Sequence, residues 1–255
     1  MAHDQRQRIG EKNPVFALWN RGGRTWGGLN RGLGFLAAMV VAGCQTLVPP
    51  PPPPPPPPLP LAGGQTGDLS SLPRDWRGLI VSRDLDRYQR LEAAWTLALK
   101  QAREMPGSGN LRSLGDLITP GAGLDYVMPP TGDYRCRTIK LGTQSDESGL
   151  GYVVYGWFAC RIEMTTAGLK LSKLSGSQRP SGIFFPENNR QMVFLGSMAL
   201  ASEPAPRSYG ERPARDMVGV LERIEETRWR LVIPWPNNES NLDLIELVPA
   251  SRARR

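Results

Sequence analysis

The chain has 255 residues, of which 40% are hydrophobic and 22% charged, and its formal net charge is +7. Residues 1–43 hold six of the 31 Lys/Arg and two of the 24 Asp/Glu, so the remainder has 25 basic and 22 acidic residues, about +3, which predicts no nucleic-acid binding. The single histidine, His3, lies in the same N-terminal stretch, which excludes a histidine-based catalytic triad from the rest of the chain and gives no reason to expect a metal or a cofactor.

A short apolar stretch near the N-terminus has the features of an export signal. Basic residues within 21–31 precede the apolar run 33–42, which is shorter than the roughly 20 residues that a membrane-spanning helix needs. The run ends in Val41-Ala-Gly-Cys44, and small residues before a cysteine resemble the lipobox of bacterial lipoproteins. That resemblance implies cleavage before Cys44 and lipid attachment to its thiol. An ordinary secretory signal and a short buried helix are the alternatives.

The residue after Cys44 bears on the destination of the protein. Gln45, in place of Asp, resembles lipoproteins that are sent on to the outer membrane. The segment before Gly32 is long for a lipoprotein leader, which favours a translation start later than Met1. We therefore expect an envelope protein that is anchored by lipid at Cys44, faces the periplasm and resides at the outer membrane.

A proline tract from Pro49 to Pro58 follows the lipobox. It favours polyproline II at about 3.1 Å per residue, so it predicts a spacer of roughly 30 Å between anchor and domain. A docking site for a proline-binding partner is the alternative. The predicted organisation is a signal peptide (1–43), a lipidated cysteine with a proline-rich linker (44–71), a single globular domain (72–249) and a basic tail (250–255).

The domain is expected to begin with an amphipathic helix after Ser82, which we take as its N-cap. Apolar residues recur at helical spacing along it: Leu85, Tyr88, Leu91, Trp95, Ala98 and Ala102. The pattern predicts five or six turns that end before Pro106-Gly107. A shorter helix is expected over Asn110 to Ile118.

From Tyr134 onward, short aromatic and β-branched runs alternate with turn residues. The predicted strands cover residues 134–141, 152–164, 169–174, 182–185, 191–200, 217–224, 228–233 and 242–248. Strands at such intervals favour an antiparallel meander that forms a small curled barrel or a sandwich. The predicted fold class is therefore α+β, with the N-terminal helix over an open end or a flank of the sheet.

The first two predicted strands each carry a cysteine. With Cys44 lipidated, Cys136 and Cys160 remain as an even pair in an oxidising compartment, which predicts one disulfide. Two buried free thiols are the alternative. If the two cysteines face each other directly, alternation divides their neighbours into two faces: Tyr134, Thr138, Phe158 and Ile162 on the cysteine face, and Arg135, Arg137, Trp157 and Arg161 on the other.

A series of motifs follows in the order below: Tyr134-Arg-Cys-Arg-Thr-Ile-Lys-Leu-Gly142, Phe158-Ala-Cys-Arg161, Lys173-Leu-Ser-Gly-Ser-Gln-Arg179, Val193-Phe-Leu-Gly196, Arg215-Asp-Met-Val-Gly219, Trp229-Arg-Leu-Val232 and Leu242-Asp-Leu-Ile-Glu-Leu-Val-Pro249. Together they resemble the bacterial family known as domain of unknown function 4893, over roughly Trp76 to Pro249. The resemblance implies an exported envelope protein. It brings no established activity, so no catalytic residue is carried over.

Two groups of polar residues are candidate binding sites. The predicted register places Arg135, Arg137 and Arg161 on one face, where guanidinium groups suit an anionic polysaccharide or lipid headgroup. Ordinary cross-strand pairing with Asp133 and Glu163 is the alternative. The second group is Ser177, Gln178 and Arg179, in a turn that would contact a ligand or partner if it lay beside a barrel opening. A purely structural turn is the alternative here.

These observations favour a non-catalytic, lipid-anchored envelope module that binds a ligand or partner, namely an anionic glycan, a lipid headgroup or an envelope protein. A carboxylate-based glycan hydrolase is the first alternative. It would need two carboxyl groups, from among Asp133, Glu163 and Asp216, about 5 to 9 Å apart in a cleft. A structural component of an envelope complex is the second, and it would show a large exposed apolar patch.

Overall fold

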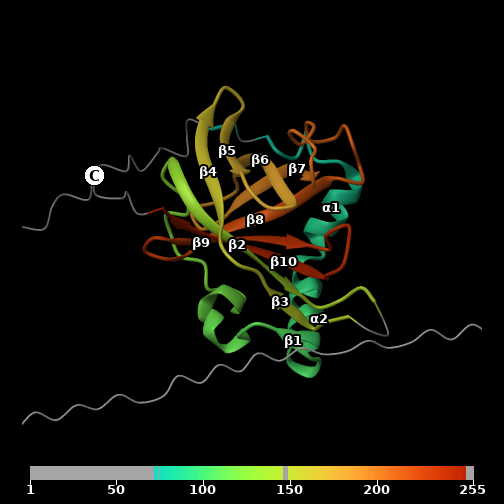
Figure 1. The fold of residues 1–255 in the computed structure, drawn as a ribbon. Coiled ribbons are helices and arrows are strands. Elements are labelled where there is room, and N and C mark those ends of the chain that lie inside the picture. The colour runs from blue at the N-terminus through green and yellow to red at the C-terminus, as the bar shows by residue number, and fades with distance from the viewer. Residues whose placement is uncertain (1–71, 74, 146–148, 251–255) are drawn as a thin grey trace, which may run out of the picture. The chain divides into compact units, whose positions relative to one another are not determined.

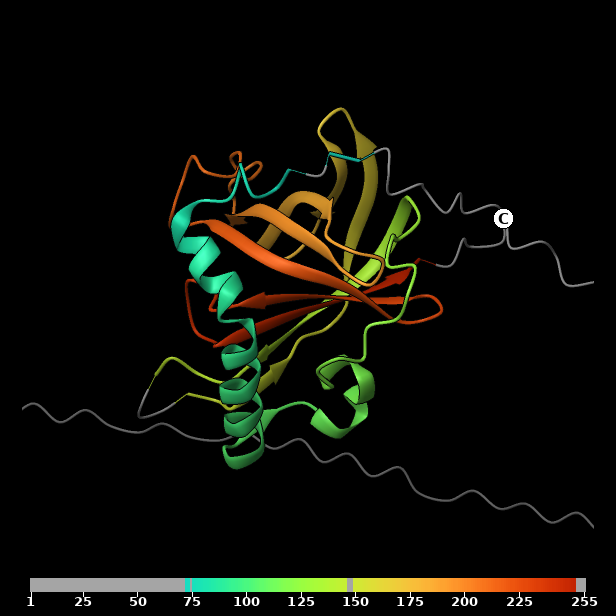
Figure 2. The ribbon, with the colours of Figure 1, turned by 180° about the vertical axis from the view of Figure 1, so that it is seen from behind.

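The computed structural model describes residues 72, 73, 75–145 and 149–250, which form a mostly β structure with helices on its flank (Figures 1 and 2). The helices are α1 (Ser82–Gln89), α2 (Leu91–Glu104) and the 3-10 helix η2 (Leu111–Ile118). The strands are β1 (Gly107–Ser108), β2 (Gly132–Leu141), β3 (Tyr152–Val154), β4 (Phe158–Thr165), β5 (Gly168–Lys173), β6 (Gln178–Pro186), β7 (Met192–Leu200), β8 (Asp216–Glu225), β9 (Arg228–Pro234) and β10 (Leu242–Pro249). Cys44, the proline tract and the basic tail lie outside the described residues.

Eight of the strands close into an antiparallel barrel. From β4 to β10 each strand pairs with the next along the chain, and β2 pairs with both β4 and β10. The sequence left a barrel and a sandwich open, and the pairing of β10 with β2 makes the barrel. Closure removes the free edges that an open sheet exposes. Within the described residues, no helix combines the length and the apolar character needed to cross a bilayer.

The second predicted strand, residues 152–164, is broken in the structure. Ile139 lies opposite Val154 and Cys136 opposite Phe158, so the three residues from Tyr155 to Trp157 face only two on β2. This extra residue is a β-bulge. The bulge divides the strand into β3 and β4, and it leaves Tyr155 and Trp157 among the exposed large side chains.

The predicted disulfide is confirmed, but its register is not the one we assumed. Cys136 and Cys160 are bonded, with 5.8 Å between their Cα atoms. Cys136 lies opposite Phe158 and Cys160 opposite Tyr134, so the bond joins diagonal positions. Because this offset is two residues, and side chains alternate with a period of two, the two predicted faces are unchanged.

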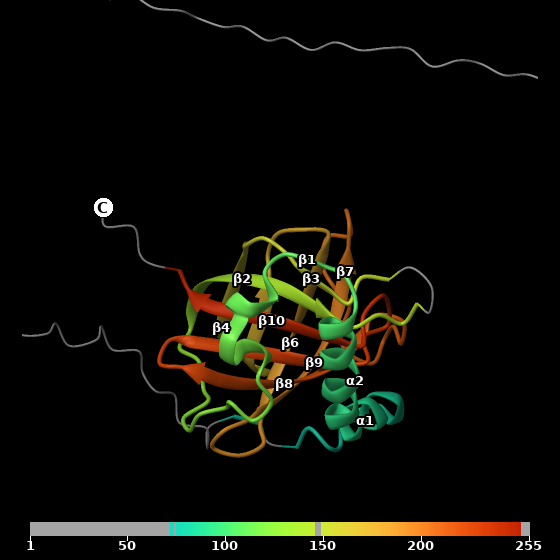
Figure 3. The ribbon, with the colours of Figure 1, turned by 90° about the horizontal axis from the view of Figure 1, so that it is seen from below.

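The predicted single helix is divided in two at Arg90, whose backbone (φ −95°, ψ 19°) departs from helical geometry. The kink lets α1 pack on β8 while α2 packs on β2, β9 and β10. Figure 3 shows α2 in front of the strands on this flank. The predicted N-cap is wrong: Val81 takes that position, and no side chain caps the helix. Trp95, Ala98 and Ala102 of the predicted stripe are buried, as expected for packing on a sheet.

One buried arginine attaches η2 to the barrel. Arg230, on the outer face of β9, has no exposed surface, and its Nη1 donates to the carbonyl oxygens of Asp116, Leu117 and Thr119 at 2.7 to 3.1 Å. Its Nη2 lies 2.7 Å from Glu222 Oε2. The guanidinium therefore binds three carbonyls at the end of η2, two of which, those of Asp116 and Thr119, also accept a backbone N–H.

Candidate functional site

The inside of the barrel is apolar at one end and charged at the other. At the apolar end, Tyr134 and Trp229 meet edge to face, with 6.2 Å between ring centroids. Trp229 Nε1 donates to Val127 O at 2.7 Å, and the Tyr134 hydroxyl donates to Pro130 O at 2.6 Å. The chain segment 127–130 thus covers this end of the barrel, and its carbonyls satisfy the polar atoms of the two rings.

At the other end, the inward positions of two neighbouring strands carry opposite charges. Lys140 of β2 lies opposite Asp243 of β10, and the Nζ to Oδ2 distance is 3.1 Å. Both side chains are less than one tenth exposed. Lys140 Nζ also lies 3.2 Å from Glu239 Oε2, and the Ser240 hydroxyl donates to Asp243 Oδ1. This end, with Lys140, Asp243, Lys173 and Gln178, is called the barrel mouth below.

Both pKa values of the pair are raised, and the two shifts favour different charge states, because a raised pKa favours the ammonium form of Lys140 but the neutral carboxyl of Asp243. Burial lowers the pKa of Lys140, but Asp243 and Glu239 together outweigh that effect and raise it. Burial raises the pKa of Asp243 by more than Lys140 and Ser240 lower it. The raised pKa of Lys140 is the better guide, because this ammonium group lies within 3.2 Å of two carboxylates. We therefore take the pair as ionised at neutral pH.

Lys173 is the second lysine of the mouth, and it is held without a carboxylate. It follows Leu169 and Leu171 on the inward face of β5, and only 7% of its surface is exposed. Its Nζ donates to Gln178 O at 2.9 Å and lies 4.0 Å from the centroid of the Phe158 ring. Among the described residues, none of the lysine ion pairs includes Lys173. Burial, reinforced by Lys140 and Arg179, lowers the pKa of Lys173 to about 8.

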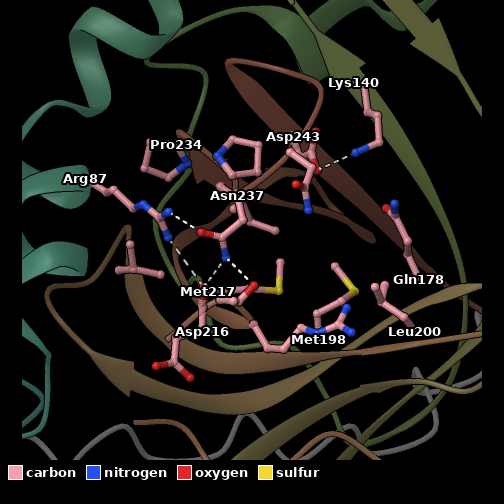
Figure 4. Close-up of a pocket in the computed structure, with 16 residues that line it drawn as sticks. Arg87, Lys140, Gln178, Met198, Leu200, Asp216, Met217, Pro234, Asn237 and Asp243 are labelled. Atoms are coloured by element: carbon pink, nitrogen blue, oxygen red, sulfur yellow. Dashed lines mark hydrogen bonds and ion pairs between the residues drawn. The ribbon is translucent and has the colours of Figure 1, made fainter. Parts of the chain in front are cut away.

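Room at the mouth is limited. The cavity there measures about 50 Å³ and is lined by Lys140, Asp243, Gln178 and Met198, among other residues. Lys173 does not line it, and it lies next to the cavity through the Gln178 carbonyl to which its Nζ donates. Figure 4 shows Lys140 and Asp243 in contact on one side, and Arg87 bonded to Asn237 on the other. A pocket for a whole small molecule measures roughly 300 Å³ or more. This cavity therefore accommodates one polar group, and it does not enclose a complete ligand. A wider hollow of about 480 Å³ also has Lys140, Glu239 and Ser240 in its lining.

The predicted arginine face exists, but ordinary pairing accounts for most of it. Arg161 Nε lies 2.9 Å from Asp133 Oδ1, and Arg137 pairs with Glu246 rather than with the acids we named. Arg135 and Arg137 both lie over the exposed ring of Trp157, at 5.0 and 4.8 Å from its centroid. Two of the three guanidinium groups thus have carboxylate partners, which weakens the case for an anion site here.

The predicted turn lies at the barrel mouth, as the second hypothesis required. Gln178 lines the cavity and Ser177 is exposed. Arg179 has a structural role, since its Nη1 donates to Gly176 O at 3.0 Å and to Ala201 O at 2.6 Å, and its Nη2 donates to Glu203 O. These bonds join the β5–β6 turn to the connection after β7.

The three candidate acids of the hydrolase alternative do not meet in a cleft. Asp133, which is exposed, and Glu163, which is half-buried, lie near each other on the outer face of β2 and β4, where they pair with Arg161 and Lys170. Asp216 is buried on β8, which is separated from β2 by β9 and β10. Burial raises the pKa of Asp216, but neither of the other two acids lies on a strand next to it. No group of three potential metal ligands occurs in the part of the chain that the structure describes.

Sequence reasoning missed Lys140, Lys173 and Asp243. A signal was present, because each residue continues an alternating inward row: Lys140 follows Tyr134, Cys136 and Thr138, and Lys173 follows Leu169 and Leu171. A lysine at an inward position breaks the pattern of a half-buried strand. All three fall within the predicted strands, and no role was predicted for them.

The comparisons identify a family and nothing more specific. A family model described as "Domain of unknown function (DUF4893)" matches residues 76–247. No curated protein and no solved structure matches the chain.

Proposed function

Because this chain belongs to the DUF4893 family, whose name carries no activity, we propose its role from the site: it is a non-catalytic, lipid-anchored envelope module that binds an anionic group of a partner at the barrel mouth. The lipid anchor at Cys44 and the outer-membrane location rest on the lipobox resemblance. The binding role rests on Lys173.

Lys173 is the observation that carries this proposal. A buried ammonium group costs stability unless an opposite charge and hydrogen bonds compensate it. Among the described residues, Lys173 has one hydrogen bond and one aromatic contact and no carboxylate partner. Departures of this kind from the rules of a stable core occur at functional sites. An incoming carboxylate or phosphate would supply the counter-charge.

The size of the cavity limits what the partner can be. At about 50 Å³, the mouth takes one charged group, while the rest of the partner lies outside the barrel. An acidic glycan, a lipid headgroup and an acidic protein segment all present such a group. The hydrolase alternative has less support, because Asp133 and Glu163 pair with Arg161 and Lys170 on the outer face, and Asp216 lies on a strand that is not next to theirs. The structural-component alternative stays a prediction.

The test follows the lysine signals of the full-length, detergent-solubilised protein by ¹³C NMR. Probes are acetate, an acidic oligosaccharide and an acidic hexapeptide. Binding at the mouth should raise the pKa of Lys173 from about 8 toward its ordinary value, since an anion stabilises the ammonium form. Lys173→Met should weaken binding of the best probe at least tenfold.

Lys100→Met is the matched control, because Lys100 is exposed on α2 and the change removes the same charge. It should leave binding unchanged. If no probe shifts the Lys173 signal, or if both variants bind equally, the mouth is not the binding site. For the anchor, Cys44→Ser should move the protein from the membrane fraction to the soluble fraction, and unchanged membrane association would contradict the lipid attachment.

A further inference from the structure

A second pocket lies outside the barrel, beneath the connection between β7 and β8. Arg207, Arg212, Arg215 and Glu203 line it, and its volume is about 260 Å³. Figure 2 shows this connection beside α1, where Tyr209 donates a hydrogen bond to Asp84 at 2.9 Å. We propose that this arginine pocket binds a phosphate-type oxyanion, at a site separate from the barrel mouth.

The charges of the arginine pocket do not balance. Arg212 Nη1 and Arg215 Nη2 each lie 3.3 Å from the same oxygen, Glu203 Oε1. The nearest carboxylate to Arg207 is that of Glu211, at 4.0 Å. The Leu200 N–H and the two arginines lower the pKa of Glu203, so its carboxylate is ionised. Three guanidinium groups therefore face one lining carboxylate, and most of their N–H donors stay available.

The floor of the pocket supplies an independent observation. Ser197, on the outward face of β7, is 1% exposed and lines the pocket, and its Oγ has no hydrogen-bond partner in the described structure. Buried hydroxyl groups are hydrogen-bonded as a rule, so an unpartnered one needs an explanation. A hydroxyl at the floor of a cationic pocket suits a ligand that offers acceptor oxygens.

The neighbouring acid Asp216 does not cancel the preference of the arginine pocket for an anion. Asp216 lies opposite Ser197 on β8, but it does not line the arginine pocket. Burial raises the pKa of Asp216. The Gly210 N–H donates a hydrogen bond to its Oδ1 at 3.2 Å, which compensates part of the negative charge. Asp216 Oδ2, like Ser197 Oγ, is buried without a hydrogen-bond partner in the described structure, and the raised pKa favours the neutral form of the acid, which does not repel an anion.

The dimensions and donors fit a phosphate group better than a larger ligand. Guanidinium groups bind phosphate through pairs of parallel N–H bonds, and three of them converge here from one connection. A volume of about 260 Å³ is just below the range of pockets that enclose a drug-sized molecule. The phosphate belongs either to a free ion or to the headgroup of a lipid.

The experiment measures binding of inorganic phosphate and of glycerol 3-phosphate to the full-length protein in detergent by titration calorimetry. Arg212→Gln with Arg215→Gln should weaken phosphate binding at least tenfold. The matched control is Arg103→Gln with Arg112→Gln, which removes two exposed arginines elsewhere and should have no effect. Ser197→Ala should weaken binding about fivefold, the loss of one hydrogen bond, without lowering the melting temperature.

Two further comparisons distinguish which pocket binds the phosphate and whether the phosphate is a free ion or part of a lipid headgroup. Arg215 and Met198 line both this pocket and the barrel mouth, so Lys173→Met shows which one holds the phosphate. Unchanged phosphate affinity in Lys173→Met supports the arginine pocket. Tighter binding of glycerol 3-phosphate than of inorganic phosphate identifies a lipid headgroup, and equal binding identifies a free phosphate. The proposal is overturned if neither probe binds saturably, or if the double variant and its control lose affinity equally.

Discussion

The two ends of the barrel differ in how the polar and charged groups buried there are paired. At the apolar end, Trp229 and Tyr134 bury large rings, and each polar atom of the rings bonds to a carbonyl of the covering segment. At the barrel mouth, three charged side chains occupy inward positions, and one of them, Lys173, has no opposite charge among the described residues. The first arrangement is typical of a stabilising core, whereas the second leaves a buried charge uncompensated at a cost in stability, as the proposed binding role requires.

The largest expected effect tests whether the mouth depends on its ion pair. Lys140→Met leaves Asp243 buried without its lysine, so the free energy of unfolding should fall by about 3 to 5 kcal/mol. The double variant Lys140→Met with Asp243→Leu should recover most of that loss, because no unpaired charge remains. Denaturant titration at neutral pH measures both. If the single variant is as stable as the parent, the pair does not hold the mouth together.

The next effect concerns Lys173 and pH. Its pKa is lowered to about 8 in the folded protein from 10.5 in the unfolded chain, so the unfolded chain binds more protons between these values and stability should rise with pH there. The difference corresponds to roughly 3 kcal/mol. Lys173→Met should be more stable than the parent at pH 7 by up to this amount and should lack the rise between pH 8 and 10.5. Melting temperatures of the two proteins across this range, in parallel, provide the measurement.

The smallest expected effect concerns the apolar end of the barrel. Trp229→Phe keeps an aromatic ring against Tyr134 but removes the N–H that bonds to Val127 O. The unfolding free energy should fall by about 1 to 2 kcal/mol, because a buried carbonyl loses its donor. Probe binding at the mouth should stay unchanged. A loss of binding in this variant would show that the two ends are coupled and that their contrast is not functional.

Local patterns in the sequence were enough to predict most strands, the helical stripe and the disulfide. Alternation and turn residues act over a few positions, so they locate β5 to β10 within a few residues of their observed limits. The bulge at Tyr155 to Trp157 and the kink at Arg90 were missed, because each depends on pairing or packing with distant strands. The barrel was one of two options, because no local feature reports that β10 meets β2.

The candidate site was only partly predictable, for the same reason. The turn before Gln178 was predicted, since glycine and small residues mark turns directly, but Gln178 and Arg179 begin β6, and only the structure places the turn beside an opening. Lys140 and Asp243 are about a hundred residues apart in the sequence, and only closure of the barrel makes them neighbours. The arginine face, by contrast, was inferred from residues close in sequence. The case for an anion site there is weaker because Glu246 of β10 pairs with Arg137.

The meeting of β2 and β10 also governs how the domain is assembled. Leu141 pairs with Leu242, so the ring of strands is completed only when β10, the last of its strands along the chain, has been synthesised. Contacts of such long sequence separation form slowly, whereas Cys136 and Cys160 lie on neighbouring strands and are able to bond early. Truncation before β10 would therefore leave two unprotected strand edges on an oxidised intermediate, which is a template for aggregation.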